Sequence, residues 1–310
     1  MSEIVLTGPR AGTPIGFLAA IGAFRHASVM SSKLGDPRLA WTHRAGEWFA
    51  TLAFDADLSS EAFLDALVKS VCETSSRPEF EWSEQIKKRD PADFRRAIEQ
   101  NSSCSDWFAA FGSELALSKD GTLRSTDFDM TGGQQKFLLK LREASCALCG
   151  SPKETRRLLQ EALFGPWEYK LATKGAEAEN SHSMGLDPST LLEGAFTAAE
   201  PAGIKDKRGI RGAIWLAFEA LPLFPCVVVD GQLRTTGFSR SRSNDGRWKT
   251  YFEWGVWNVP LTLEAVTTLL LQPRCEWTPD RGVAQRFRSE RVNLNKDYYS
   301  LAQAELMTGG

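Results

Sequence analysis

The chain has 310 residues, 42% of them hydrophobic and 25% charged, which is the balance of a globular protein and excludes disordered, collagen-like and coiled-coil chains. No run approaches the ~18 apolar residues of a membrane span, and residues 1–10 lack the features of a signal peptide, so we expect a cytoplasmic protein. The 37 Lys and Arg and 39 Asp and Glu give a net charge of −2, but residues 201–310 hold 15 basic and 11 acidic residues, which favours a polyanion site toward the C-terminus.

The N-terminal part predicts a helix beside an antiparallel hairpin. Thr13 supplies an N-cap and Pro14 a first helical residue for a helix over 15–30. Several small residues on this helix indicate close packing against another element. Strands are predicted over 38–43 and 47–54, joined by a short loop that contains glycine. We therefore expect the helix to pack on this hairpin.

Capping residues and apolar periodicity predict the remaining helices, over 60–71, 91–100, 131–149, 152–164, 188–198, 210–221 and 261–271. Thr131-Gly-Gly-Gln134 fits a capping box at the start of the third of these, and this helix and the next are expected to form an antiparallel pair. Extended segments or strands are predicted over 123–130, 226–230, 232–238, 250–256 and 283–292.

These elements predict a mixed α+β fold with three parts: an N-terminal helix on an antiparallel hairpin, central helical pairs, and a C-terminal β-rich basic region. Residues 1–170 are expected to form an α/β domain with a helical insert. Residues 187–310 are expected to form an α/β region with a basic loop. The polar, glycine-containing stretch 171–186 is interpreted as a linker or mobile loop.

The sequence lacks the common catalytic signatures. It contains no nucleophile elbow, phosphate-binding loop, dinucleotide fingerprint or zinc-protease motif. Its three histidines are isolated, and Cys146-x-x-Cys149 has no second cysteine pair to complete a zinc ribbon. We therefore expect no catalytic residues, no metal and no cofactor, and we expect the six cysteines to be reduced.

Two other functions stay open. Asp127 and Asp129 lie on one side of an extended segment and, with Asp120, are able to bind a cation, as in a metal-dependent nuclease of a defence system. Many of the ten tryptophans lie beside charged residues, a pattern found at interfaces, which is compatible with a protein-binding adaptor.

The strongest polyanion candidate is a cation-rich loop expected between two strands, with the residues Arg240, Arg242, Asn244, Arg247, Trp248 and Lys249. The cations would contact phosphates, the amide would add hydrogen bonds, and the indole would stack on bases or wedge between them. A solvated cationic surface is the alternative interpretation of this loop.

Two further pairs of residues are candidates for nucleic-acid binding. Arg286 and Arg288 fall on one face of the strand predicted over 283–292. Gln134 and Gln135 follow two glycines at a predicted helix start, where backbone N–H groups receive phosphates and the amides reach base edges. Plain helix capping is the alternative for the glutamines.

Short motifs connect the chain to a known group of proteins. The helix segment 14–25 (PIGFLAAIGAFR) followed by Leu39-Ala-Trp41 resembles the N-terminal signature of CRISPR type I-U/I-G effector proteins. Further short segments are similar to the same group: 133–135, 165–169, 185–188, 217–225, 254–261 and 287–289. Leu186 stands where that pattern usually has tryptophan before Asp-Pro, and the histidine-rich nuclease part of related systems is missing.

The resemblance implies a large-subunit role in a crRNA-guided antiviral surveillance complex. Such a subunit binds crRNA and reads a short motif in target double-stranded DNA before the strands separate. The implied partners are crRNA, target DNA, other CRISPR effector subunits and a helicase-nuclease, with no membrane. We therefore predict a non-catalytic nucleic-acid-binding subunit.

Overall fold

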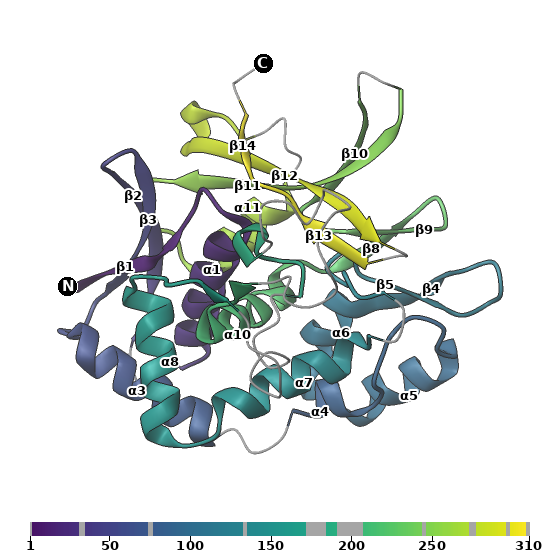
Figure 1. The fold of residues 1–310 in the computed structure, drawn as a ribbon, viewed down its shortest axis with the longest axis horizontal. Helices are drawn as coiled ribbons and strands as arrows, with labels where there is room; N and C mark the ends of the chain where they lie inside the picture. The colour runs from purple at the N-terminus through teal and green to yellow at the C-terminus, as the bar shows by residue number, and fades with distance from the viewer. Residues whose placement is uncertain are drawn as a thin grey trace.

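Two antiparallel sheets and a layer of helices are packed around a shared interior in the computed structural model (Figure 1). The structure describes residues 2–30, 35–73, 77–132, 135–171, 184–190, 207–243, 246–272, 277–295 and 298–307. The predicted mixed α+β class is confirmed, with a strand and helix at the N-terminus and a β-rich C-terminal part. Among the described residues, no helix is both long and apolar enough to cross a membrane.

The N-terminal sheet has the order β1-β3-β2, with β1 at Ser2–Arg10, β2 at Arg38–Arg44 and β3 at Glu47–Phe54. The pairing of β2 with β3 confirms the predicted hairpin. Strand β1 was not predicted, because Gly8 and Pro9 are typical turn residues. An irregularity in the register between Leu6 and Arg10 accommodates them on this edge strand.

The first helix, α1 (Pro14–Val29), begins as predicted, since the Thr13 side chain accepts a hydrogen bond from the Gly16 N–H at 3.1 Å. It meets the hairpin through Phe17, whose ring stacks on Trp41 with centroids 5.7 Å apart. Its small residues serve another contact: α1 packs along α10 (Arg211–Glu219). A Cβ atom added to Gly22 would lie 1.7 Å from the Leu216 carbonyl oxygen.

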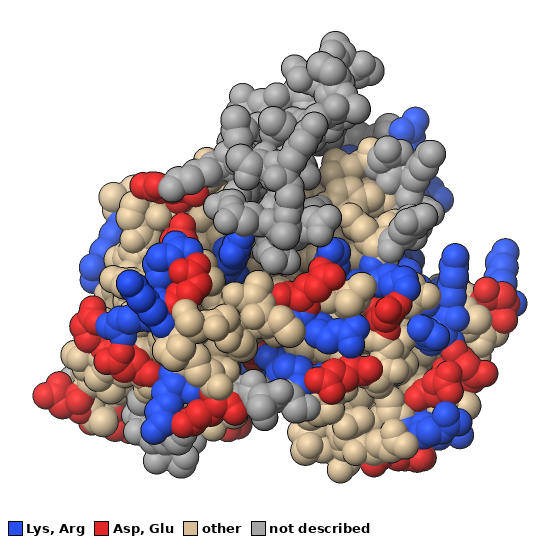
Figure 2. Space-filling view, turned by 60° about the horizontal axis from the view of Figure 1, so that its bottom comes forward, with Lys and Arg blue, Asp and Glu red and all other residues tan. Residues whose placement is uncertain are grey.

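The helical layer comprises α3 (Ser60–Glu73), α4 (Pro78–Glu81), α5 (Pro91–Gln100), α6 (Ser105–Phe111), α7 (Phe137–Leu148) and α8 (Pro152–Phe164). Helix α8 packs mainly on α3 and β1, whereas α7 packs mainly on α10 and α4. The two consecutive helices therefore share only a small contact and do not form the expected antiparallel pair. Charged side chains of both signs lie interspersed over this face of the molecule (Figure 2).

The predicted capping box does not start α7. The helix begins at Phe137, and no side chain of a described residue caps its N-terminus. The Thr131 hydroxyl and N–H instead donate to the Asp129 carboxylate, and the Gln135 N–H donates to the Gly132 carbonyl. These local hydrogen bonds hold the backbone in turns at the point where the helix was predicted.

The C-terminal sheet has the order β10-β11-β12-β13, and β14 pairs with β12. Its strands are β10 (Phe238–Arg242), β11 (Trp248–Trp257), β12 (Val283–Asn295), β13 (Tyr298–Leu301) and β14 (Glu305–Leu306), with α11 at Leu263–Leu271. The remaining strands form pairs: β4 (Gly112–Leu117) with β5 (Leu123–Ser125), β6 (Lys170–Leu171) with β7 (Lys207–Arg208), and β8 (Cys226–Val229) with β9 (Gln232–Thr235).

The two sheets meet across α1. Trp254 stacks on Phe17 with centroids 5.7 Å apart, and its indole N–H donates to the Ala11 carbonyl at 2.8 Å. Trp257 donates in the same way to the Leu39 carbonyl at 2.7 Å. One hydrophobic core therefore includes residues from both predicted regions, 1–170 and 187–310. Most of the predicted linker, residues 172–183, lies outside the described residues, as do 191–198 of the helix predicted over 188–198.

Candidate nucleic-acid interface

Most of the segment predicted as a cation-rich loop is a two-stranded arm. Strand β10 continues to Arg242 and β11 begins at Trp248, so only residues 243–247 connect them. The register pairs Arg242 with Trp248 and Arg240 with Thr250. We call the paired residues 238–242 and 248–252 the arm. Asn244, one of the predicted site residues, lies outside the described residues.

The arm places the predicted cations on two opposite faces. Side chains alternate along a strand, and residues paired across an antiparallel ladder point to the same side. The inner face, continuous with the core, carries Phe238, Arg240, Arg242, Trp248, Thr250 and Phe252. The outer face carries Lys249, which contacts a different set of partners. The prediction of one contiguous cationic loop is therefore replaced by two separate surfaces.

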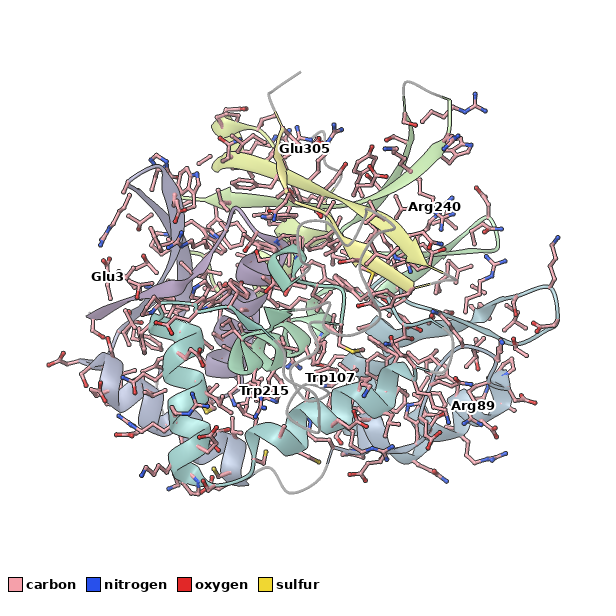
Figure 3. All side chains as sticks on the ribbon, in the orientation of Figure 1. Glu3, Arg89, Trp107, Trp215, Arg240 and Glu305 are labelled. Carbon is pink, nitrogen blue, oxygen red and sulfur yellow. The ribbon has the colours of Figure 1, made fainter. Side chains whose placement is uncertain are left out.

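The arginines of the inner face have no acidic partner within the described part of the chain. The Arg242 guanidinium lies over the Trp248 ring, 5.4 Å from its centroid. The Arg240 side chain is exposed, and its guanidinium has neither an ion pair nor a hydrogen bond to another described residue; Figure 3 labels it between β10 and β9. The Trp248 side chain is 67% exposed. Two cations and an indole therefore face solvent together.

The cations of the outer face are paired with carboxylates or lie within the sheet. Lys249 forms a 2.7 Å ion pair with Glu290. Arg288 pairs with Glu305 at 2.9 Å, and its guanidinium lies over the Tyr251 ring. Arg286 shares this face, as the alternation predicted, and is half-buried. Arg247, in the turn, has further contacts of its own.

A cavity of about 640 Å³ lies beside the inner face of the arm. Its lining comes from three elements: Phe238, Arg240, Trp248 and Thr250 of the arm, Arg234 and Thr235 of β9, and Asp127 from the segment after β5. Arg234 is half-buried, and its guanidinium has neither an ion pair nor a hydrogen bond to another described residue. We call this cavity the arm pocket.

Backbone contacts fix Asp127 at the arm pocket. Its N–H donates to the Thr235 hydroxyl at 2.7 Å. Its carbonyl accepts from the Arg291 Nε–H at 3.0 Å, and another N–H of this guanidinium donates to the Asp129 carbonyl at 3.1 Å. Burial lowers the pKa of Arg291, whose guanidinium also lies over the Tyr299 ring. The segment that carries Asp127 is thus held from two sides.

The three aspartates considered for a nuclease do not converge. Asp129 is 1% exposed and forms an ion pair with Lys87 at 3.3 Å. Asp120 lies in the turn between β4 and β5, where hydrogen bonds from Ser118 and Thr122 lower its pKa. Among the described residues, no group of three or more His, Cys, Asp or Glu side chains is arranged to hold a metal ion.

Only one residue of the predicted glutamine pair is described by the structure. Gln134 lies outside the described residues, and Gln135 is half-buried before α7. The side-chain oxygen of Gln135 is buried and has no hydrogen-bond partner among the described residues. Gln135 is not among the described residues that line the arm pocket.

Sequence reasoning identified the arm but missed the opposite wall of the pocket. Arg240 and Trp248 stood out because cations and an indole lie close together in the sequence. Asp127 and Arg234 are isolated in the sequence and join the site only through the tertiary fold. Alternation along the predicted strand 232–238 is the one sequence signal for Arg234, because it places this residue on the opposite face from its neighbours Leu233 and Thr235, which are buried.

Comparison with known proteins adds no assignment: no protein family matches the chain, and no curated protein matches it. The similarity to CRISPR effector proteins therefore depends on the short motifs of the sequence.

Proposed function

We propose that this protein is a non-catalytic nucleic-acid-binding subunit whose inner arm face contacts the sugar-phosphate backbone. The observation that carries this proposal is the exposed group Arg240, Arg242 and Trp248, because the two guanidinium groups have no carboxylate partner among the described residues. Guanidinium groups bind phosphates through pairs of N–H donors, and an exposed indole offers a surface for base stacking.

The motifs of the sequence support a more specific role. We place the protein in the cytoplasm, within a crRNA-guided antiviral complex, in the role of the large subunit. Its partners are then crRNA, target double-stranded DNA, other CRISPR effector subunits and a helicase-nuclease. The motif residues Phe17, Trp41 and Trp254 are buried where α1 meets the two sheets. The motifs therefore concern the fold, and the nucleic-acid contact rests on the arm.

Salt-dependent binding tests the contact. Each phosphate contact that is lost lowers the slope of log K against log salt by about one unit. Arg240→Ala/Arg242→Ala should therefore weaken binding to duplex DNA or single-stranded RNA and flatten its salt dependence by about two units. Binding is measured by fluorescence anisotropy at several salt concentrations, on the protein alone and in its assembled complex.

A matched control removes the same charge elsewhere. Arg95 and Arg96 on α5 are exposed but form ion pairs with Glu114 and Asp93. Arg95→Ala/Arg96→Ala should leave the slope unchanged. If the arm variant keeps the wild-type affinity and slope for both DNA and RNA, the arm is a solvated surface and the proposal fails. Mg²⁺-dependent cleavage that Asp127→Ala abolishes would establish the nuclease alternative instead.

A further inference from the structure

We propose that the arm pocket holds one unpaired nucleotide of the bound strand and selects guanine. This inference rests on the proposed function and specifies what the same surface recognises. It depends on three features of the pocket walls, namely two arginines without partners, an exposed indole, and a fixed carboxylate.

The arginines provide the site for phosphate. Arg234 comes from β9 and Arg240 from β10, and both line the pocket. Neither forms an ion pair with Asp127, although this carboxylate lines the same cavity, nor with any other described residue. Two guanidinium groups that line one cavity without forming an ion pair attract an anion with several acceptor oxygens, which is the chemistry of a phosphodiester.

The aromatic residues provide the site for a base. Trp248 lines the pocket although its side chain is 67% exposed, and Phe238 lies deeper on the same face of the arm. Packing within the chain does not account for so exposed an indole in a pocket wall. Stacking on a base would cover it, and every base has a ring face to offer.

Asp127 decides which ligand fits. A carboxylate repels a simple anion, so the ligand must bring hydrogen-bond donors together with its phosphate. Guanine presents two neighbouring donors, N1–H and the N2 amino group, which match the two oxygens of one carboxylate. Adenine and cytosine present an amino group beside a ring acceptor, and uracil presents one N–H between two carbonyl oxygens.

The size of the pocket is compatible with a nucleotide. A volume of about 640 Å³ lies within the range of small-molecule sites, about 300–1,000 Å³. The Watson–Crick edge of guanine is free to meet Asp127 only when the base is unpaired.

The test measures binding of the full chain to uridine hexamers that contain one guanine, adenine or cytosine, by fluorescence anisotropy. The wild-type protein should bind the guanine hexamer about tenfold more tightly than the others. Asp127→Asn replaces two acceptors by one acceptor and one donor, which matches the edge of adenine or of cytosine. This variant should therefore lose the preference for guanine or invert it toward adenine or cytosine. Its affinity for the plain uridine hexamer should not fall, because the substitution removes a negative charge beside the phosphate.

Control variants separate the pocket features. Asp120→Asn changes an exposed carboxylate outside the pocket and should keep the guanine preference. Arg234→Ala should weaken binding of every hexamer by a similar factor. Trp248→Phe should retain binding better than Trp248→Ala, because a ring face remains. The same series in DNA shows whether the 2′-hydroxyl takes part.

The outcomes distinguish this inference from the proposed function. If the wild-type protein shows no guanine preference, or if Asp127→Asn keeps it, guanine selection by the pocket is overturned. The proposed function still stands in that case, provided that Arg240→Ala/Arg242→Ala lowers the affinity and the salt slope. If the arm variant changes neither, both the function and the inference fail.

Discussion

Glu219 is the clearest case of a single residue on which the interior depends. Its side chain is 5% exposed on α10, with Arg77 at 2.8 Å, Arg25 at 3.5 Å and His26 at 3.8 Å. Burial by itself would raise the pKa of Glu219, but the neighbouring positive charges outweigh it and lower the pKa to about 2. Trp107 and Trp215, labelled in Figure 3, adjoin this cluster through Arg77 and His26.

Replacement of Glu219 by Gln should destabilise the protein at neutral pH by about 1–3 kcal/mol, because Arg25 and Arg77 each lose one of two carboxylate partners and keep only Asp106 and Glu79. The folded pKa of about 2 lies below the ordinary 4.5, so the contribution of this carboxylate is complete above pH 4.5. It is lost as the pH falls from 4.5 toward 2, and the variant should lack this part of the acid dependence. Urea unfolding at several pH values measures both effects.

A surface carboxylate serves as the comparison for Glu219. Glu47 forms an exposed ion pair with Arg10 at 2.9 Å. Glu47→Gln should change stability by less than about 1 kcal/mol, since solvent screens exposed pairs. Equal effects of the two substitutions would show that the Glu219 cluster adds nothing specific to folding.

At the scale of elements, capping residues made several helix starts predictable from the sequence, whereas the strand over residues 2–10 was not predictable. Ser59, Asp90 and Ser151 accept N–H hydrogen bonds at the starts of α3, α5 and α8, three helices that were predicted from capping residues. Residues 2–10 were not recognised as a strand, because Gly8 and Pro9 suit a turn equally well when the neighbouring backbone is unknown. Gly8 is needed there because an added Cβ would lie 2.4 Å from the Ala162 carbonyl oxygen. That reason exists only in the tertiary structure.

The candidate site was also predicted only in part, because the arrangement of its residues depends on strand pairing and tertiary contacts. The composition of 240–249 indicated a polyanion site, and alternation along β10 and β11 then divides its cations between two faces. The division was not predicted, because the first strand was expected to end before Arg240 and the second to begin only at Thr250. Asp127 reaches the pocket through hydrogen bonds with residues more than a hundred positions away, which no local pattern encodes.

The close contact between α1 and α10 predicts how a substitution at Gly22 changes the stability of the protein. In the interior of a helix, replacement of Gly by Ala normally stabilises the helix by about 1 kcal/mol. Here the added Cβ would lie 1.7 Å from the Leu216 carbonyl oxygen, and backbone atoms cannot turn away as a flexible side chain does. We expect the variant to lose about 1–3 kcal/mol of stability because the two helices must separate. Thermal unfolding followed by circular dichroism measures the loss.

Gly150 offers a matched control for Gly22. It follows α7, and an added Cβ would meet nothing closer than 4.0 Å. Gly150→Ala should leave the melting temperature nearly unchanged. A Gly22→Ala variant that is as stable as the wild-type protein would show that α1 and α10 are not in close contact.

At the scale of the whole molecule, the two sheets form one interior in the described part of the chain. Phe17 of α1 lies against Trp41 from the N-terminal sheet and Trp254 from the C-terminal sheet. Leu39 and Leu261 exchange two backbone hydrogen bonds, of 2.8 and 2.9 Å, between β2 and the segment before α11. Residues 1–170 and 187–310 therefore complete each other's core, and neither region covers its own apolar surface.

This shared interior predicts that the chain unfolds as one cooperative unit, and two buried tryptophans at the junction provide the test. Trp257 donates to the Leu39 carbonyl at 2.7 Å, whereas the Trp41 indole N–H is buried without a hydrogen-bond partner among the described residues. Both side chains are 1% exposed, so replacement by Phe removes a similar volume from the same region.

Trp257→Phe also removes one of the two hydrogen bonds that the Leu39 carbonyl accepts, the other coming from the Leu261 N–H. It should therefore cost about 0.5–1.5 kcal/mol more than Trp41→Phe. In both variants, urea unfolding followed by far-ultraviolet circular dichroism and by tryptophan fluorescence should give coincident transitions, because loosening the junction weakens both sheets together. A transition that splits in two, with one step unaffected by Trp257→Phe, would show instead that the N-terminal and C-terminal regions fold independently.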